Sequence, residues 1–122
     1  MAQKFRFLEW QVYRDSKSLF ADVLGVVNKL PQKYRFDLGG QITRSCFSIM
    51  LNIAEGSGKA TDKDFNRYLD ISLGSLYEVV ASFDILRDNK IISEKEFQDL
   101  FNKSSVISDQ IGGFKKKLKN LS

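Results

Sequence analysis

The sequence predicts an all-α fold, an antiparallel up-down-up-down four-helix bundle, and three observations support this prediction. Apolar residues recur at intervals of three and four along most of the 122-residue chain, as one face of an α-helix requires. No segment alternates between apolar and polar residues for long enough to form a strand. The periodic segments are joined by short connections, which favour antiparallel neighbours. We therefore expect a single domain, residues 1–122, with helices at about 8–30, 38–56, 62–89 and 93–120.

The first helix is predicted over about residues 8–30, and its end is well marked. Pro31 is the only proline, and the residue that precedes a proline is disfavoured in helical geometry. Residues 32–37 are predicted to form a short polar loop, in which Asp37 caps the second helix by accepting hydrogen bonds from its free amides. The apolar face of the first helix comprises Leu8, Val12, Leu19, Val23 and Val26 or Val27.

Two stripes run along the second helix, about residues 38–56. One is apolar, and the other consists of small and amide side chains, which is not typical of a solvated face and predicts a contact surface. The lone cysteine, Cys46, is predicted to be a small core residue. Gly56 and Gly58 are predicted to end the helix in left-handed conformations. The apolar stripe contains Ile42, Cys46, Ile49 and Ile53, and the polar stripe contains Gln41, Ser45, Ser48, Asn52 and Glu55.

The third and fourth helices both open with a capping-box pattern, at residues 61–64 and 93–96. In each, a hydroxyl and a carboxylate are placed to satisfy free backbone amides of the first turn. The core positions then step by three and four in alternation, which is the heptad rhythm of left-handed helix packing. These positions are Phe65, Leu69, Ser72, Leu76, Val79, Phe83 and Leu86 in the third helix, and Phe97, Leu100, Ser104, Ile107, Ile111, Phe114, Leu118 and Leu121 in the fourth.

A polar network is predicted between the second and third helices, because a hairpin centred near Lys59 places Arg44 one turn from Glu78. We expect Arg44 to pair with Glu78, and Arg67 to pair with Glu55 or Asn52, in a way that fixes register more than it adds stability. The alternative is a set of exposed ions that contribute little. Whether the network lies within one chain or between subunits is left open. Its members, as network or interface, are Gln41, Arg44, Ser48, Asn52, Glu55, Arg67, Tyr68, Ser75 and Glu78.

The formal net charge of +4 permits an acidic partner without requiring one, and cations gather near the C-terminus. These residues are predicted to contact RNA or DNA through the phosphate backbone, with an affinity that falls as salt rises. The alternative is that lysines near a helix C-terminus complement the helix dipole and solubilise the protein. The predicted nucleic-acid residues are Lys115, Lys116, Lys117 and Lys119, joined by Lys4 and Arg6 if the termini lie near each other.

The chain has no histidine and one cysteine, so the commonest general base and the commonest metal ligands are missing. There is no P-loop, no Ser/His/Asp set and no Glu-x-x-His motif. We therefore expect no enzyme activity, no catalytic residue, no cofactor and no bound metal. The N-terminus has no signal-peptide pattern and no apolar run is long enough to span a membrane, so we expect a cytoplasmic protein without a membrane partner.

The sequence resembles one family over nearly its whole length. The resemblance is carried by QITRS (41–45), Ser48-Ile49, NIAEG (52–56), DFNRYL (64–69) and GSL (74–76) with Glu78, and by FLEWQ (7–11) and Leu30-Pro31. These segments are similar to the signature of bacterial four-helix-bundle proteins. The family includes proteins encoded within intervening sequences of 23S ribosomal RNA genes and the accessory variability determinant proteins of diversity-generating retroelements.

The resemblance implies an antiparallel four-helix bundle, a ring-shaped homopentamer and no enzyme activity. It also implies binding of nucleic acid and a reverse transcriptase through basic surfaces in the retroelement members. Those members are strongly basic, whereas this chain is mildly basic and carries ten acidic residues after Ala60, which favours the intervening-sequence type. Two functional hypotheses stay open: an oligomer that binds nucleic acid through basic patches, and a scaffold that recruits a protein partner.

Overall fold

The structure, a computed structural model, describes residues 4–119, and within this range it contains helices and no strands. This confirms the predicted all-α class. The elements are the 3₁₀ helix η1 (Arg6–Glu9) and the α-helices α1 (Gln11–Lys29), α2 (Gln32–Arg35), α3 (Asp37–Ser57), α4 (Asp62–Asp88) and α5 (Glu94–Lys119). The predicted core position Leu121 lies outside the described residues. None of the described helices is both long enough and apolar enough to cross a membrane.

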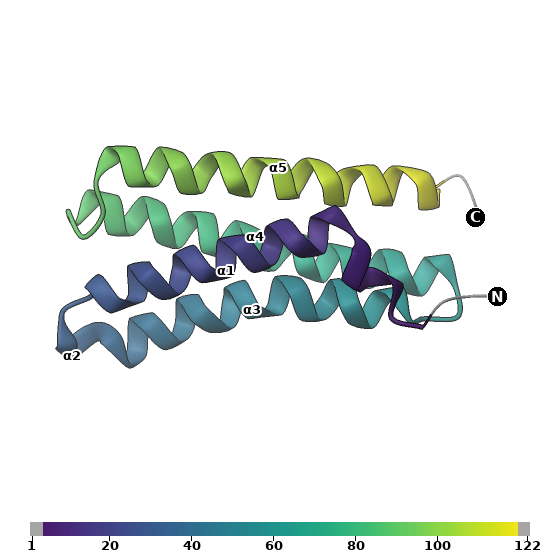
Figure 1. The fold of residues 1–122 in the computed structure, drawn as a ribbon, viewed down its shortest axis with the longest axis horizontal. Coiled ribbons are helices and arrows are strands. Elements are labelled where there is room, and N and C mark those ends of the chain that lie inside the picture. Colours follow the sequence, from purple (N-terminus) through teal and green to yellow (C-terminus); the bar gives the residue numbers. More distant parts are fainter. Residues whose placement is uncertain (1–3, 120–122) are drawn as a thin grey trace.

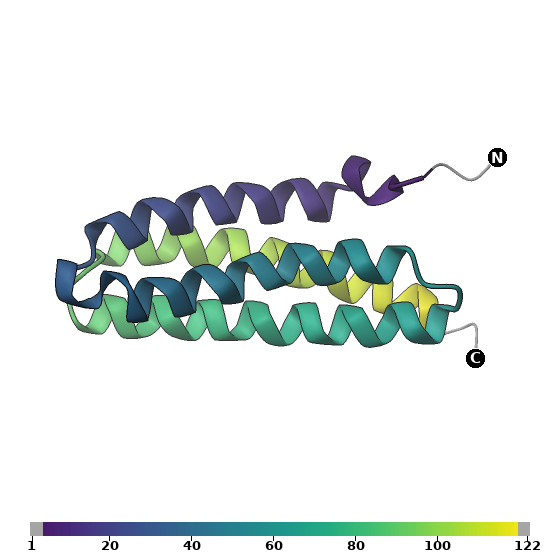
Figure 2. The same ribbon diagram turned by 90° about the horizontal axis from the view of Figure 1, so that it is seen from below.

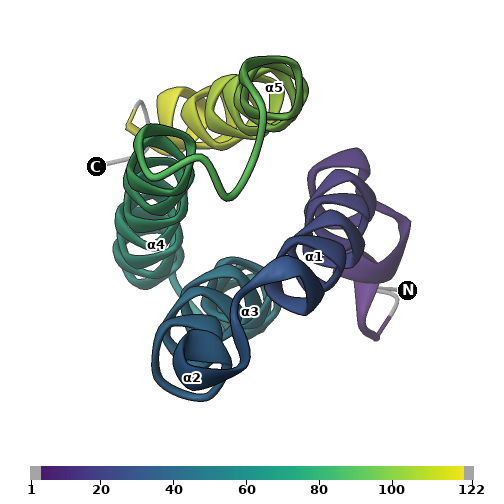
Figure 3. The same ribbon diagram turned by 90° about the vertical axis from the view of Figure 1, so that its left-hand side faces the viewer.

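The four long helices lie side by side, and consecutive ones run in opposite directions (Figures 1 and 2). Viewed along their axes, α1 lies against α3, α3 against α4 and α4 against α5, and a sparser contact joins α5 back to α1 (Figure 3). The core lies between them and is formed by the predicted apolar positions. Its fully buried members include Leu19, Ile49, Phe83, Ile107 and Ile111.

The contact between α1 and α5 is polar, in contrast to the apolar core. Three bridges join the two helices at intervals of seven residues on each, and these intervals match one face of the heptad. A cavity of about 620 Å³ is lined by both helices, including the residues of two of these bridges. The bridges are Asp15–Gln110, Asp22–Lys103 and Lys29–Glu96.

The predicted start of the first helix at Leu8 is wrong. The backbone of Trp10 is extended, with φ −77° and ψ 137°, so α1 begins at Gln11 and Leu8 belongs to η1, where it is 48% exposed. The Trp10 ring instead packs against Phe114, with ring centroids 4.8 Å apart. The helical path is thus broken at Trp10, whose partly buried ring contacts α5.

The predicted stop at Pro31 is confirmed, because α1 ends at Lys29 and Leu30 is extended. The predicted loop over residues 32–37 is wrong: residues 32–35 form α2, and α3 begins at Asp37. Asp37 does not cap α3. Phe36, which precedes it, already has helical dihedral angles, so Asp37 lies inside the helix and the N-terminus has no side-chain cap.

In the α3–α4 turn, the glycines do not adopt the backbone conformation that the sequence predicted. No glycine among the described residues has a positive φ, so Gly56 and Gly58 do not provide left-handed conformations. Gly56 instead permits close packing, because a Cβ at this position would lie 2.8 Å from the Cβ of Tyr68. Helix α3 continues to Ser57 and the chain then turns with Gly58 at φ −93°.

Both predicted capping patterns form, one of them in part. The Thr61 hydroxyl accepts a hydrogen bond from the Asp64 amide at 3.1 Å, but the Asp64 carboxylate pairs with Arg67 and not with the Thr61 amide. At the start of α5 the box is reciprocal. The Glu96 amide donates to the Ser93 hydroxyl and the Ser93 amide donates to the Glu96 carboxylate, each at 3.0 Å.

Candidate nucleic-acid interface

An aromatic cluster brings the start of α1, the start of α4 and the end of α5 to the same end of the molecule. It consists of Trp10, Phe65 and Phe114, whose ring centroids lie 4.8 to 6.0 Å apart. Arg6 lies over the Trp10 ring, with Cζ 5.8 Å from the centroid. The N-terminal cations and the C-terminal lysines therefore occupy the same end of the molecule, on the right in Figure 1. We call this the terminal end.

The predicted lysine cluster is only partly available to a ligand. The Lys115 ammonium donates a hydrogen bond to the Asn66 side chain at 3.0 Å and pairs with the Asp70 carboxylate. Its side chain is 21% exposed, so Lys115 joins α5 to α4. The two lysines that follow it, Lys116 and Lys117, are exposed and have no ion-pair partner among the described residues. The side chain of Lys119 lies outside the described part of the chain.

The two predicted N-terminal cations remain accessible. Lys4 and Arg6 are exposed, and neither forms an ion pair within residues 4–118. The nearby Glu9 carboxylate is engaged by Arg14 at 3.0 Å. Four of the six predicted nucleic-acid residues, namely Lys4, Arg6, Lys116 and Lys117, are thus exposed and uncompensated at the terminal end.

Three further cations lie at the terminal end that the sequence did not assign to nucleic-acid binding, and one of them, Arg67, was predicted only as a member of the polar network. Lys59 and Arg67 both lie over the Tyr68 ring, with the charged atoms 5.0 and 5.3 Å from its centroid. Each also forms a long ion pair, Lys59 with Glu55 at 3.8 Å and Arg67 with Asp64 at 4.0 Å, so their charges are partly compensated. The third cation, Lys63, is exposed. Lys63 and Arg67 are four residues apart, which places them on one face of α4. This spacing is the sequence signal that could have indicated a shared surface.

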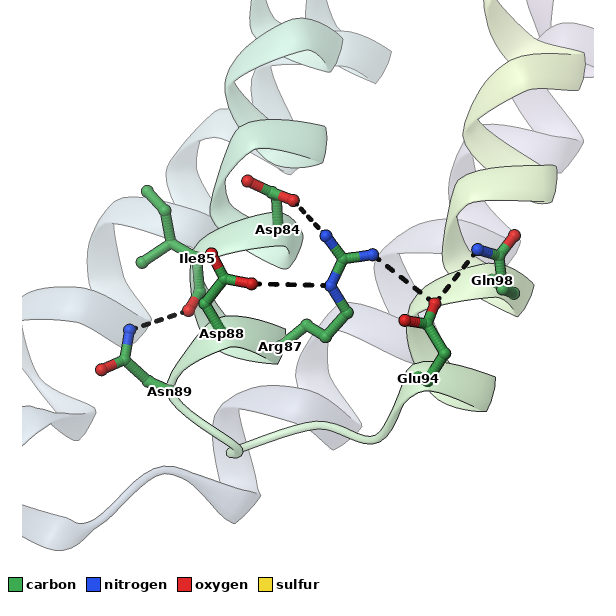
Figure 4. A network of polar contacts seen from close by, with 7 residues as sticks. All are labelled: Asp84, Ile85, Arg87, Asp88, Asn89, Glu94 and Gln98. Atoms are coloured by element: carbon green, nitrogen blue, oxygen red, sulfur yellow. Dashed lines mark hydrogen bonds and ion pairs between the residues drawn. The ribbon is translucent and has the colours of Figure 1, made fainter.

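Arg87 at the opposite end of the molecule provides a contrast, because its charge is compensated (Figure 4). Three carboxylates lie within ion-pair distance of its guanidinium, those of Asp84, Asp88 and Glu94. The guanidinium also lies 3.9 Å from the ring centroid of Phe97. Arg87 thus holds the α4–α5 turn together, and its charge is not free to attract a phosphate.

The predicted pairing of Arg44 with Glu78 is wrong. Within the described residues no carboxylate lies within ion-pair distance of Arg44, whose guanidinium folds back over Gly40, 3.1 Å from where a Cβ would stand. Glu78 instead accepts a hydrogen bond from the Ser45 hydroxyl at 3.0 Å. Ser45 is buried on the face of α3 that meets α4, whereas the neighbouring Arg44 is exposed, so the hydroxyl and not the guanidinium contacts Glu78.

The polar stripe of α3 is nevertheless a contact surface, and the contact lies within one chain. The Ser75 hydroxyl on α4 donates to the Ser48 hydroxyl at 2.9 Å, and the Asn52 amide donates to the Ser48 carbonyl at 2.8 Å. Another α4 hydroxyl, that of Ser72, donates to the Ile49 carbonyl at 2.8 Å. Arg67 pairs with neither Asn52 nor Glu55. Gln41, another predicted member, is exposed at the edge of this surface.

Cys46 is fully buried in the core, as predicted. Burial, and to a smaller extent the negative charge of Asp22, raises the pKa of its thiol to about 12. Such a thiol stays protonated and unreactive at neutral pH. Elsewhere in residues 4–119, no group of three or more histidine, cysteine, aspartate or glutamate side chains is placed to hold a metal ion.

The comparison with known families assigns the chain directly. Residues 9–113 match the 23S rRNA-intervening sequence protein family. The chain therefore belongs to the 23S rRNA-intervening sequence protein family. The matched region ends at residue 113, just before the lysines that follow Phe114. No curated protein is significantly similar in sequence to this chain.

A solved structure supports the same fold for this member of the 23S rRNA-intervening sequence protein family. It is a crystal structure of a protein with unknown function from the S23 ribosomal protein family of Bacteroides thetaiotaomicron. The TM-score is 0.79 and the sequence identity is 24%, and the alignment covers 86% of this chain and 98% of that chain. The similarity shows a shared fold.

Proposed function

We propose that this protein is a non-enzymatic antiparallel four-helix bundle of the 23S rRNA-intervening sequence type, which self-associates and binds RNA or other nucleic acid in the cytoplasm. The observation that carries the proposal is the set of exposed cations at the terminal end. Lys4, Arg6, Lys116 and Lys117 lie together at this end, and none of them has an ion-pair partner among the described residues. Uncompensated cations are those that a phosphate backbone attracts.

The net charge of +4 is small, but it fits this proposal because several exposed cations lie together at the terminal end. Binding depends on local fields as well as on net charge, and a patch of one sign raises the local concentration of an oppositely charged ligand. Because such contacts carry no base information, we propose binding that is salt-dependent and weakly selective in sequence.

We also propose self-association, but for a different reason from the one that the sequence suggested. Two residues of the polar stripe, Ser45 and Ser48, form hydrogen bonds with α4, so this part of the stripe no longer argues for an interface between subunits. Large apolar side chains are exposed instead, among them Phe47 at 47% and Leu51 at 50% on α3. Contiguous exposed apolar surface is typical of association sites. The resemblance to ring-forming relatives makes a homopentamer our preferred assembly.

The nucleic-acid proposal is tested by measuring binding of a fluorescently labelled single-stranded RNA by anisotropy at several salt concentrations. The variant Lys116→Gln/Lys117→Gln removes two terminal cations, and Lys33→Gln/Lys95→Gln removes two exposed lysines from the opposite end. Loss of about two phosphate contacts lowers the slope of log K against log salt by about 1.4 for a single strand. We expect this change in the first variant alone. If the wild-type protein does not bind the RNA even at low salt, the proposal fails.

A protein-interaction scaffold is the second candidate, and one groove favours it. The groove lies between α4 and α5, has a volume of about 430 Å³ and is lined mainly by apolar and small side chains. Tyr77 and Phe101 border it with exposures of 67% and 43%. Tyrosine and phenylalanine are enriched at protein interfaces. A protein partner that binds the oligomer in the absence of RNA, and whose binding is lost in Tyr77→Ser, would favour the scaffold.

A further inference from the structure

Phe5 occupies an unusual position at the terminal end. Its φ of 59° and ψ of 43° place it in the left-handed region, which bulky residues rarely adopt because the Cβ is crowded. Its side chain is also 68% exposed, although burial of an aromatic ring is favourable. Two costs, backbone strain and an aromatic ring in water, thus coincide at one residue. Strain of this kind is characteristic of functional positions.

The backbone around Phe5 holds the residue in place. The Phe5 carbonyl accepts a hydrogen bond from the Leu8 amide at 3.2 Å, which closes the first turn of η1. Helix η1 in turn contacts both α1 and α3. The ring is therefore presented from an ordered turn on the main body of the protein.

The neighbours of Phe5 in the chain are cations that form no ion pair with any residue the structure describes. Lys4 and Arg6 flank it in the chain, both exposed, and Arg6 extends over the Trp10 ring. The closest acidic residue in sequence, Glu9, is occupied by Arg14. An exposed aromatic ring between two free cations is the combination used to bind single-stranded nucleic acids, where bases stack on rings and cations contact phosphates.

We propose that residues 4–6 bind single-stranded RNA or DNA, with Phe5 stacking on an unpaired base and Lys4 and Arg6 contacting the adjoining phosphates. This inference rests on the proposed nucleic-acid function and makes it specific to single strands. In a duplex, each base is already stacked on both faces and its plane is not accessible to Phe5.

The test measures the affinity of the full-length protein for a labelled 12-nucleotide oligouridine and for an RNA duplex of the same length. Phe5→Ala is expected to weaken binding of the single strand by about tenfold, in line with the loss of one stacked base. Phe5→Trp is expected to retain binding. The matched control is Phe36→Ala, which removes an aromatic side chain that is 87% exposed from the opposite end of the molecule. It is expected to bind like the wild type.

A second variant distinguishes a role of Phe5 in nucleic-acid binding from a role in stabilising the fold. Phe5→Gly relieves the left-handed strain, so its melting temperature is expected to equal or exceed that of the wild type while its affinity for oligouridine falls. A structural role for Phe5 would lower both. The inference is overturned if Phe5→Ala and Phe36→Ala bind oligouridine equally, if the duplex binds as tightly as the single strand, or if Phe5→Ala alters only the oligomeric mass. Absence of any RNA binding by the wild type would instead overturn the proposed function itself.

Discussion

Gly56 shows how one small residue sets the distance between two helices. A Cβ at this position would lie 2.8 Å from the Cβ of Tyr68 and 2.9 Å from the Phe65 ring, which real side chains do not tolerate without movement. The backbone of α3 therefore approaches α4 more closely here than any larger residue permits. The sequence marked Gly56 as conformationally special, but only the packing of α4 reveals that its role is steric.

We predict that Gly56→Ala destabilises the protein by about 1 to 3 kcal/mol, since the cost of overpacking exceeds the gain in helix propensity. Gly74→Ala is the matched control, because it also lies within a helix but has no neighbour within 4 Å of its Cβ position. This control is expected to stabilise the protein by up to about 1 kcal/mol. Chemical denaturation of both variants measures the difference, and equal effects would contradict the steric role of Gly56.

Cys46 provides a second prediction at the residue scale. Because burial raises the pKa of its thiol to about 12, the thiolate is scarce at neutral pH and the sulfur has no access to solvent. A thiol-specific reagent should therefore modify the native protein only at the rate at which it unfolds. Modification in denaturant should be immediate. As a control, Ser105→Cys introduces an exposed thiol on α5, which should react at once in the native state.

Among the elements, α5 has the best-defined beginning. The reciprocal Ser93–Glu96 box satisfies amides of its first turn, and the Lys29 ammonium bridges Glu96 to the end of α1. The hydrogen bond from Lys29, followed by the one from the Ser93 amide, lowers the pKa of the Glu96 carboxyl below its ordinary value of 4.5. The same carboxylate thus caps one helix and ties it to another.

We predict a pH dependence of stability that originates at Glu96. A carboxyl with a lowered pKa in the folded state binds fewer protons there than in the unfolded state, so it favours folding at higher pH. This stabilisation is complete above about pH 4.5 and is lost as the pH falls through the lower pKa of the folded state. Glu96→Gln should therefore be less stable at neutral pH and should lose less stability on acidification below pH 4.5.

The control for Glu96 is Asp109→Asn, which removes an exposed carboxylate of the same helix that makes no hydrogen bond or ion pair within the described residues. Thermal unfolding from pH 3 to pH 7 compares the two variants. If both change the pH profile equally, the effect belongs to net charge and not to the capping box.

The sequence predicted the helices because their signals are local. Heptad steps, Pro31, the Ser93–Glu96 box and the hydroxyl half of the Thr61–Asp64 box act within a few residues, and the structure confirms them. The errors have longer-range causes. The break at Trp10 coincides with packing of its ring on Phe114, which lies far along the chain. Phe36 has helical dihedral angles, so Asp37 lies inside α3 and the predicted cap does not form.

On the scale of the whole molecule, the candidate surface was predicted in part. The sequence locates the cations, but their availability depends on carboxylates from other helices. Asp70 on α4 takes up Lys115, whereas Lys116 remains exposed. Likewise, the spacing along the sequence predicted a pair between Arg44 and Glu78, but Ser45, which is buried beside α4, forms the hydrogen bond instead. Whether these cations are compensated depends on carboxylates from other helices, so the sequence pattern alone does not establish it.

A single measurement tests both the proposed pentameric assembly and the proposed binding of RNA. Light scattering coupled to gel filtration gives the mass of the protein alone and with a single-stranded RNA, at low and at moderate salt. We predict a pentamer that gains mass with RNA at low salt and loses the RNA as salt rises, because phosphate contacts release counterions. A monomer, or an oligomer whose mass is the same with and without RNA at low salt, would contradict the account.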